Sequence, residues 1–110
     1  MRETVVALTT LPADFDAVPL AQALVAAGLA ACVDIVPAVT SVYTWKGEPQ
    51  IDREQQLIIK TTADMTGPLW DAIKTGHPYE VPEFLILSVT DGSEDYLTWI
   101  IDSVAPQRES

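Results

Sequence analysis

Seven consecutive residues, His77 to Glu83, hold most of the side chains in this sequence that could do chemistry. The segment contains the only histidine of the chain, one phenol, two carboxylates and two prolines. An imidazole can carry a proton near neutral pH or bind a metal ion. The prolines fix their own φ and keep the residues before them out of the helical region, so we expect a stiff, extended connector. Connectors of this kind on a rigid frame often carry binding groups, and the segment is therefore a candidate site.

Two residues are candidate metal ligands, and each has an alternative role. Cys32 is the only cysteine, and it could be a small buried apolar residue of a strand or a thiolate ligand for a soft metal such as copper. His77 could cap the C-terminus of a helix, or it could bind metal or transfer protons. Two ligands per chain cannot complete a tetrahedral site, so a metal centre would need carboxylates or a neighbouring subunit.

The acidic and aromatic side chains near these residues also have alternative roles. Glu80 and Glu83 are three positions apart on extended backbone and point to opposite faces, which weakens a two-carboxylate acid–base mechanism. One of them could form an ion pair with Lys60, which lies in an apolar run. Tyr43 and Trp45 share one face of a strand and could pack against another chain or form the wall of a small-molecule cleft. No nucleophile elbow, phosphate loop or HExxH motif is present, and the sequence favours a protein that is not an enzyme.

The composition limits the class of protein and its partners. The chain has 110 residues, of which 48% are hydrophobic, and we expect one domain over residues 1–110. A net charge of −10 with six scattered basic residues argues against nucleic acid as a partner. The N-terminus lacks the pattern of a signal peptide, and the longest apolar run, residues 23–33, is roughly half of what a membrane span requires. A single cysteine fits a reducing compartment, so we predict a cytoplasmic protein with no membrane partner.

The pattern along the chain predicts the elements that must position these residues. We expect a first helix capped by Asp14 or Asp16, a second helix opened by Asp64 or Thr66, and a last helix capped by Ser93. The strands are expected over residues 4–11, 31–45, 54–62 and 84–89. The helices are expected over residues 17–27, from 64 or 66 to 76, and from 93 to 104. We also expect a turn at residues 46–49 and a polar tail from residue 106. The order β-α-β-β-α-β-α predicts an α+β fold, a ferredoxin-like βαββαβ sandwich with an extra C-terminal helix.

The apolar strands predict self-association. Right-handed crossovers would place the first two helices on one face of the sheet, leaving the other face open. Residues 57–59 and 84–87 are nevertheless apolar without interruption, which is typical of strands that are buried on both faces. We therefore expect a homo-oligomer whose open faces pack together.

Four segments together resemble the CutA divalent-cation tolerance proteins. They are residues 29–33 (LAACV), 40–47 (TSVYTWKG), 58–61 (IIKT) and 77–83 (HPYEVPE), and the similarity runs from about Thr4 to Trp99. The resemblance implies a ferredoxin-like homotrimer, similar in shape to the PII signalling proteins, whose long hairpins pair between subunits. It also implies copper or another divalent cation as a bound partner and a role in divalent-cation tolerance. Two departures stand out: Asp34 where an amide is commoner, and Ala38 where glycine is usual.

The resemblance also assigns residues by matching position. Cys32 and His77 would be the metal ligands. The residues that would line or support an inter-subunit cleft are Tyr43, Trp45, Lys60, Tyr79, Glu80 and Glu83. The family carries no firm enzymatic activity, so an enzyme with His77 or Glu83 as general base is the least favoured alternative. A signalling or scaffolding trimer that binds a small anion or nucleotide in the cleft is the other alternative.

Overall fold

The computed structural model describes residues 2–105, so the predicted polar tail from residue 106 lies outside the described residues. None of the helices within this range has the length and apolar composition needed to cross a membrane. The elements in chain order are β1 (Thr4–Pro12), α1 (Val18–Ala26), β2 (Cys32–Trp45), β3 (Glu48–Thr62), a short 3₁₀ helix (Ala63–Met65), α2 (Thr66–Thr75), β4 (Leu85–Ser88) and α3 (Glu94–Ser103).

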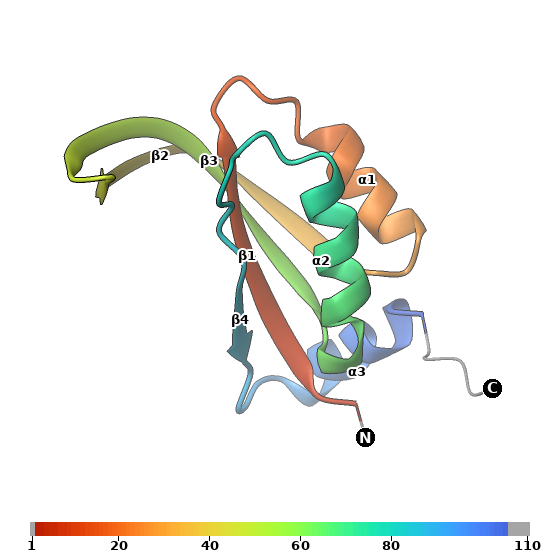
Figure 1. The fold of residues 1–110 in the computed structure, drawn as a ribbon. Coiled ribbons are helices and arrows are strands. Elements are labelled where there is room, and N and C mark those ends of the chain that lie inside the picture. Colours follow the sequence, from red (N-terminus) through yellow and green to blue (C-terminus); the bar gives the residue numbers. More distant parts are fainter. Residues whose placement is uncertain (1, 106–110) are drawn as a thin grey trace.

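The four strands form one antiparallel sheet in the order β2-β3-β1-β4. Helices α1 and α2 lie together against one face of this sheet, and α3 packs at the end where the N-terminus lies (Figure 1). The predicted α+β class and the ferredoxin-like arrangement with an added C-terminal helix are confirmed. Strands β2 and β4 are the two edges of the sheet.

The core lies between the sheet and the pair α1 and α2. Alternate residues of β1 and β3 point toward the helices, as the period of two of a strand requires. The apolar core residues on this side are Ala7, Leu11, Leu24, Leu57, Ile59, Leu69 and Ile73. A second, smaller cluster of Ala31, Met65, Ile100 and Val104 holds α3 against the end of the sheet. The two clusters make the sheet a rigid base for the connectors at its ends.

Of the three predicted N-terminal helix caps, the structure contains one. Ser93 caps α3 as predicted, because its hydroxyl accepts a hydrogen bond from the Tyr96 N–H at 3.3 Å. The predicted caps of α1 were wrong: α1 begins after Ala17, with no side-chain cap, and Pro19 in the first turn supplies the helical φ instead. The second helix begins at Thr66, because Asp64 belongs to the preceding 3₁₀ helix, and it also lacks a side-chain cap.

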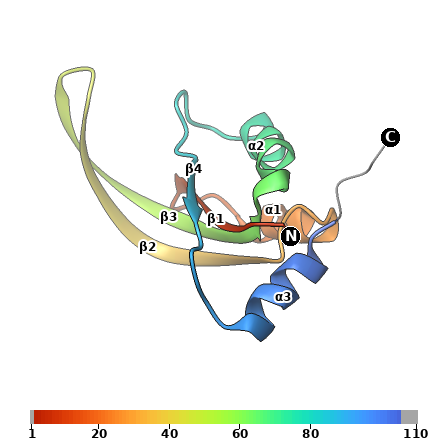
Figure 2. The same cartoon turned by 90° about the horizontal axis from the view of Figure 1, so that it is seen from below.

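The β2–β3 hairpin is longer than the sequence predicted. The turn uses only Lys46 and Gly47, whose φ values of 51° and 81° suit the mirror-image turns of tight hairpins. Strand β3 therefore begins at Glu48, and the predicted start at Glu54 was wrong. Strand β1 pairs with β3 only from Glu54 onward, so residues 39–53 extend beyond the sheet as a two-stranded arm. Figure 2 shows this arm curving away from the rest of the molecule.

The face of the sheet opposite α1 and α2 is only partly covered. In β4, Leu85 and Leu87 pair with Leu8 and Val6 of β1 and share their face of the sheet. Both β4 leucines are exposed. The arm residues Val42 and Ile51 are exposed as well, on the opposite side of their strands. The protomer alone therefore does not bury the second side of its apolar strands.

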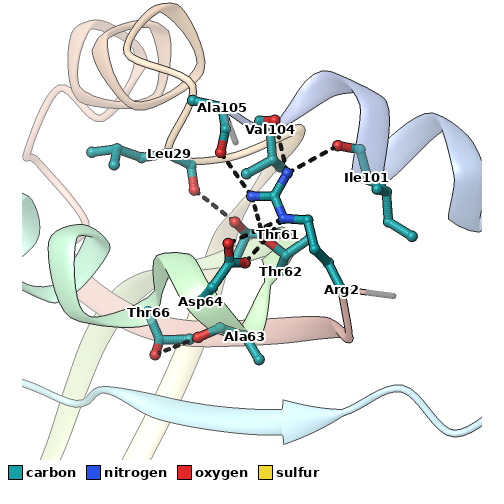
Figure 3. A network of polar contacts seen from close by, with 10 residues as sticks. All are labelled: Arg2, Leu29, Thr61, Thr62, Ala63, Asp64, Thr66, Ile101, Val104 and Ala105. Carbon is teal, nitrogen blue, oxygen red and sulfur yellow. Dashed lines mark hydrogen bonds and ion pairs between the residues drawn. The ribbon is translucent and has the colours of Figure 1, made fainter. Parts of the chain in front are cut away.

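Arg2 ties the first strand to the C-terminal helix (Figure 3). Its guanidinium forms an ion pair with Asp64 at 3.1 Å and donates to the Thr62 hydroxyl at 3.0 Å. It also donates to the carbonyl oxygens of Val104 and Ala105, at 3.2 and 2.7 Å. These carbonyls follow the end of α3, where backbone acceptors lack intrahelical partners, so one side chain satisfies several of them.

Candidate functional site

A cleft of about 740 Å³ lies where the segment of residues 77–83 packs against the arm. The segment runs between α2 and β4, and the arm belongs to the β2–β3 hairpin. The residues that line the cleft are Thr10, Ser41, Val42, Tyr43, Trp45, Glu54, Pro78, Tyr79, Glu80, Val81, Pro82 and Glu83. The cleft therefore brings together five of the eight predicted site residues: Tyr43, Trp45, Tyr79, Glu80 and Glu83.

His77 fixes the start of the segment through both ring nitrogens. The Tyr79 N–H donates to Nδ1 at 3.1 Å, so the proton of the neutral ring is on Nε2. Nε2 lies 2.8 Å from the Thr10 carbonyl oxygen and donates to it. The backbone N–H of His77 also donates to the Lys74 carbonyl near the end of α2, at 3.3 Å. In this arrangement the imidazole positions the segment against β1, and neither ring nitrogen has a free lone pair.

Tyr79 connects the segment to the base of the arm. Its hydroxyl donates to Glu54 Oε2 at 2.7 Å, and Glu54 is only 7% exposed. Burial first, and then the hydrogen bond to Glu54 and the charge of that carboxylate, raise the pKa of the Tyr79 hydroxyl, which therefore remains a donor. Glu54 was predicted only as the first residue of a strand, so sequence reasoning missed this role.

Glu83 holds a carboxylate oxygen that has no internal partner. Its Oε2 is fully buried and makes no hydrogen bond within the described residues. Burial raises the pKa of the Glu83 carboxyl, and the negative charge of Glu54 adds to this, whereas a hydrogen bond with Gln56 acts in the opposite direction. Buried polar atoms are normally paired, so an unpaired acceptor on a side chain that lines a cleft indicates a place for a donor.

The arm supplies the aromatic wall of the cleft. The register places Ser41, Tyr43 and Trp45 on one face, as the alternation predicted. The Tyr43 hydroxyl donates to the carboxylate of Asp52 on the opposite strand, and this bond raises the pKa of the phenol. At the rim, Glu80 lies 3.8 Å from the Lys46 ammonium, and both side chains are exposed.

The charged side chains that line the cleft are all negative. Three carboxylates, those of Glu54, Glu80 and Glu83, line it, and none of its lining residues in the described chain is a lysine or arginine. A low-dielectric wall strengthens the field of such groups. The cleft therefore attracts cations and repels anions.

Cys32 and Lys60 lie outside the cleft, further along the open face of the sheet. They occupy paired positions on β2 and β3, and Asp34 is two residues further along the same face. The Cys32 thiol lies 3.5 Å from Asp34 Oδ1, and the Lys60 ammonium lies 2.8 Å from Asp34 Oδ2. The prediction that Lys60 pairs with Glu80 or Glu83 was wrong, because strand register gives it Asp34 as its neighbour.

The ionisable side chains of this cluster shift one another's pKa values. Burial first, and then the hydrogen bond and charge of Asp34, raise the pKa of the Cys32 thiol. The hydrogen bond from Lys60 lowers the pKa of Asp34, and the same bond raises the pKa of Lys60. The Lys60 ammonium also lies 5.7 Å above the Tyr96 ring of α3. The thiol is therefore mostly protonated near neutral pH.

One protomer does not bring the two predicted metal ligands together. Cys32 pairs with Lys60, whereas Thr10, which His77 contacts, pairs with Gln56 four residues away along β3. Four residues of strand correspond to about 13 Å. Residues 2–105 contain no group of three or more histidine, cysteine, aspartate or glutamate side chains that could hold a metal ion. The assignment of Cys32 and His77 as metal ligands stays a prediction that requires a second copy of the chain.

Comparison with known proteins places the chain in a family. Residues 5–103 match the family model described as CutA1 divalent ion tolerance protein. The chain is 44% identical over 98 residues to the divalent-cation tolerance protein CutA of Salmonella newport, covering 89% of this chain and 85% of that one. It superposes on CutA1 from Oryza sativa with a TM-score of 0.90 and 37% identity, covering 96% and 97% of the two chains. For the divalent cation tolerance protein of Thermus thermophilus the TM-score is 0.87 and the identity 41%, covering 93% and 99%. With the sequence and the fold in agreement over nearly its whole length, the chain belongs to the CutA1 divalent ion tolerance family.

Proposed function

We propose that this protein acts in divalent-cation tolerance as a single-domain, cytoplasmic homotrimer that binds divalent cations, copper first among them. The observation that carries the proposal is the pairing of the Cys32 thiol with the Asp34 carboxylate, 3.5 Å apart on the open face of the sheet. A thiolate is a soft ligand that suits copper, and a carboxylate beside it adds the negative charge that a cation requires. Catalysis is not part of the proposal.

The proposed metal site requires assembly, because the two ligands of one chain do not come together and a further ligand must come from another copy. Exposed apolar side chains of β4 and the arm, among them Leu87 at 50% and Val42 at 74%, provide surfaces that a second and third copy would cover. In the trimer, His77 of a neighbouring subunit would be the next ligand. Two internal bonds would then have to open: Lys60 would release Asp34, and His77 would release either Thr10 or Tyr79.

Copper titration under reducing conditions tests this proposal. We expect Cys32→Ala and His77→Ala each to weaken copper binding by about tenfold or more, because each removes one ligand from a small set. Ser103→Ala, at an exposed position on α3 away from the cluster, is the matched control and should bind as the unchanged protein does. Equal affinity in all four proteins would reject the assigned ligands.

A second candidate function is that of a PII-like signalling or scaffolding trimer with a small ligand in the cleft. The cleft volume of about 740 Å³ favours it, because small-molecule sites have this size. The charge of the lining residues argues against a nucleotide or another anion as that ligand. Calorimetry with a panel of nucleotides checks this point, and binding at micromolar concentration would show that the charge argument is mistaken.

A further inference from the structure

We propose that the cleft between the arm and residues 77–83 binds an organic cation: a primary ammonium group on a small apolar body, received by Glu83 and Glu54. The site is separate from the cluster of Cys32, Asp34 and Lys60, none of which lines the cleft. The inference therefore does not depend on the metal-binding function proposed above, and either one can fail without the other.

The acceptor for the ammonium group is the unpartnered oxygen of Glu83. Glu83 lines the cleft, and its Oε2 is buried and makes no hydrogen bond in the described chain. A buried acceptor without a donor is destabilising, and a ligand N–H would supply the missing hydrogen bond. Glu54, the second carboxylate, keeps one oxygen engaged by Tyr79. The groups that act on the Glu83 carboxylate are Gln56 and Glu54 of β3, and neither carries a positive charge.

The walls of the cleft suit the apolar part of such a ligand. Tyr43 and Trp45 form the side that belongs to the arm, and Pro78, Val81 and Pro82 line the opposite side. Aromatic faces attract an ammonium group and also bury apolar carbon. Pro78 and Pro82 fix part of the backbone of the segment, which lowers the ordering cost of binding.

The same features exclude other ligand classes. An anion would meet three carboxylates and no lining lysine or arginine within the described residues. A metal ion would leave most of a cavity of about 740 Å³ unused, and the described residues offer no three-ligand cluster. A quaternary ammonium has no N–H to donate to Glu83 Oε2. A primary ammonium supplies both charge and donors.

Calorimetry on the assembled, full-length protein tests the proposal with three probes that share one phenylethyl body. The probes are 2-phenylethylamine, its neutral analogue 2-phenylethanol and its trimethylammonium analogue. We expect the primary amine to bind at least about tenfold more tightly than either analogue, because the alcohol has no positive charge and the trimethylammonium group has no N–H to donate. Trp45 lines the cleft, so quenching of its fluorescence gives a second readout.

Variants identify the groups responsible. Glu83→Gln should weaken binding of the amine by about tenfold or more. Glu94→Gln makes the same charge change on the first turn of α3 and should leave binding unchanged. Trp45→Leu should also weaken binding, and it keeps the test open if Glu83→Gln alters assembly. Three results would overturn the proposal: equal binding of the neutral alcohol, equal loss in Glu94→Gln, or no heat from the amine at about 10 mM.

Discussion

Glu83 combines a cost in stability with a candidate role in binding. Its raised pKa means that the folded protein favours the protonated carboxyl more than the unfolded chain does. Such a group contributes stability that is fully present below its unfolded pKa and is lost as the pH rises through the folded pKa. As the pH rises above the folded pKa, the negative charge of this partly buried carboxylate therefore destabilises the fold.

Glu83→Gln should raise the free energy of unfolding at pH 7 by about 1 kcal/mol, because the buried charge is removed while the shape is kept. Denaturant unfolding at pH 7 and at pH 4 measures this, and the gain should shrink at the lower pH, where the native side chain is protonated. A loss of stability at pH 7 would show that the carboxylate is paired in solution. A gain in stability together with a loss of amine binding is the result expected of a ligand site.

Asp34 should control the reactivity of Cys32. Asp34→Asn removes a negative charge that raises the thiol pKa, so the pKa should fall and alkylation by iodoacetamide at pH 7 should become a few times faster. Lys60→Met removes a positive charge that lowers the same pKa and should slow the reaction. The pH dependence of the alkylation rate gives both pKa values, and changes in the same direction would contradict the arrangement seen here.

At the scale of elements, the connection between β1 and α3 depends on Arg2. Burial acting alone would raise the pKa of Asp64, but hydrogen bonds from Thr62 and Arg2, with the charge of Arg2, outweigh it and the pKa is lowered. A lowered acid pKa contributes stability that is present above the unfolded value and lost as the pH falls through the folded one. The attachment of α3 should therefore weaken in acid.

Arg2→Met should lower the free energy of unfolding by about 2 kcal/mol at pH 7, the range for hydrogen bonds to charged groups. Its effect should be smaller below about pH 4, where Asp64 begins to be protonated. Arg53→Met, at an exposed position of the arm, is the control and should change stability little. A pH-independent effect would assign the loss to packing rather than to the ion pair.

The arm depends on the positive φ of its turn. Gly47→Ala should destabilise the hairpin by about 1 kcal/mol for backbone reasons alone, since nothing lies within 4 Å of the added Cβ. Gly67→Ala, in α2 and equally unobstructed, should instead be neutral or stabilising because alanine is the better helix former. Thermal unfolding of the two variants separates the effects, and equal losses would show that the turn conformation is not the cause.

The exposed apolar side chains of the whole molecule support the proposed self-association. Leu87 of β4 and Val18 of α1 have similar exposures, 50% and 52%, but Leu87 lies on the open face of the sheet and Val18 on a helix that covers the other face. Substitutions at these two positions can therefore test which of the two surfaces mediates self-association.

Light scattering coupled to size-exclusion chromatography should give a mass three times that of the 12.0 kDa chain. Leu87→Glu should reduce that mass, because it places a charge in the proposed interface, while Val18→Glu should not. A monomeric mass for the unchanged protein would reject the trimer, and dissociation by both variants would reject the open face as its surface.

The sequence by itself determined the elements and their order. Alternation in the strands, the stripe of apolar residues in each helix and the Ser93 cap are local patterns, and local patterns specify local structure. The face shared by Tyr43 and Trp45 was predictable for the same reason. The resemblance to a family, carried by four short segments, was confirmed by the comparisons.

Only the tertiary structure decided which charged groups meet. Glu54 and Tyr79 are 25 residues apart, and Lys60 and Asp34 are 26 apart. Each contact depends on strand register and on how the proline-rich segment lies against the arm. A shift of one residue in register would move every side chain of a strand to the other face, so composition and spacing cannot assign these partners. The acidic, aromatic cleft is therefore formed by the tertiary contact between residues 77–83 and the arm, which the sequence did not predict.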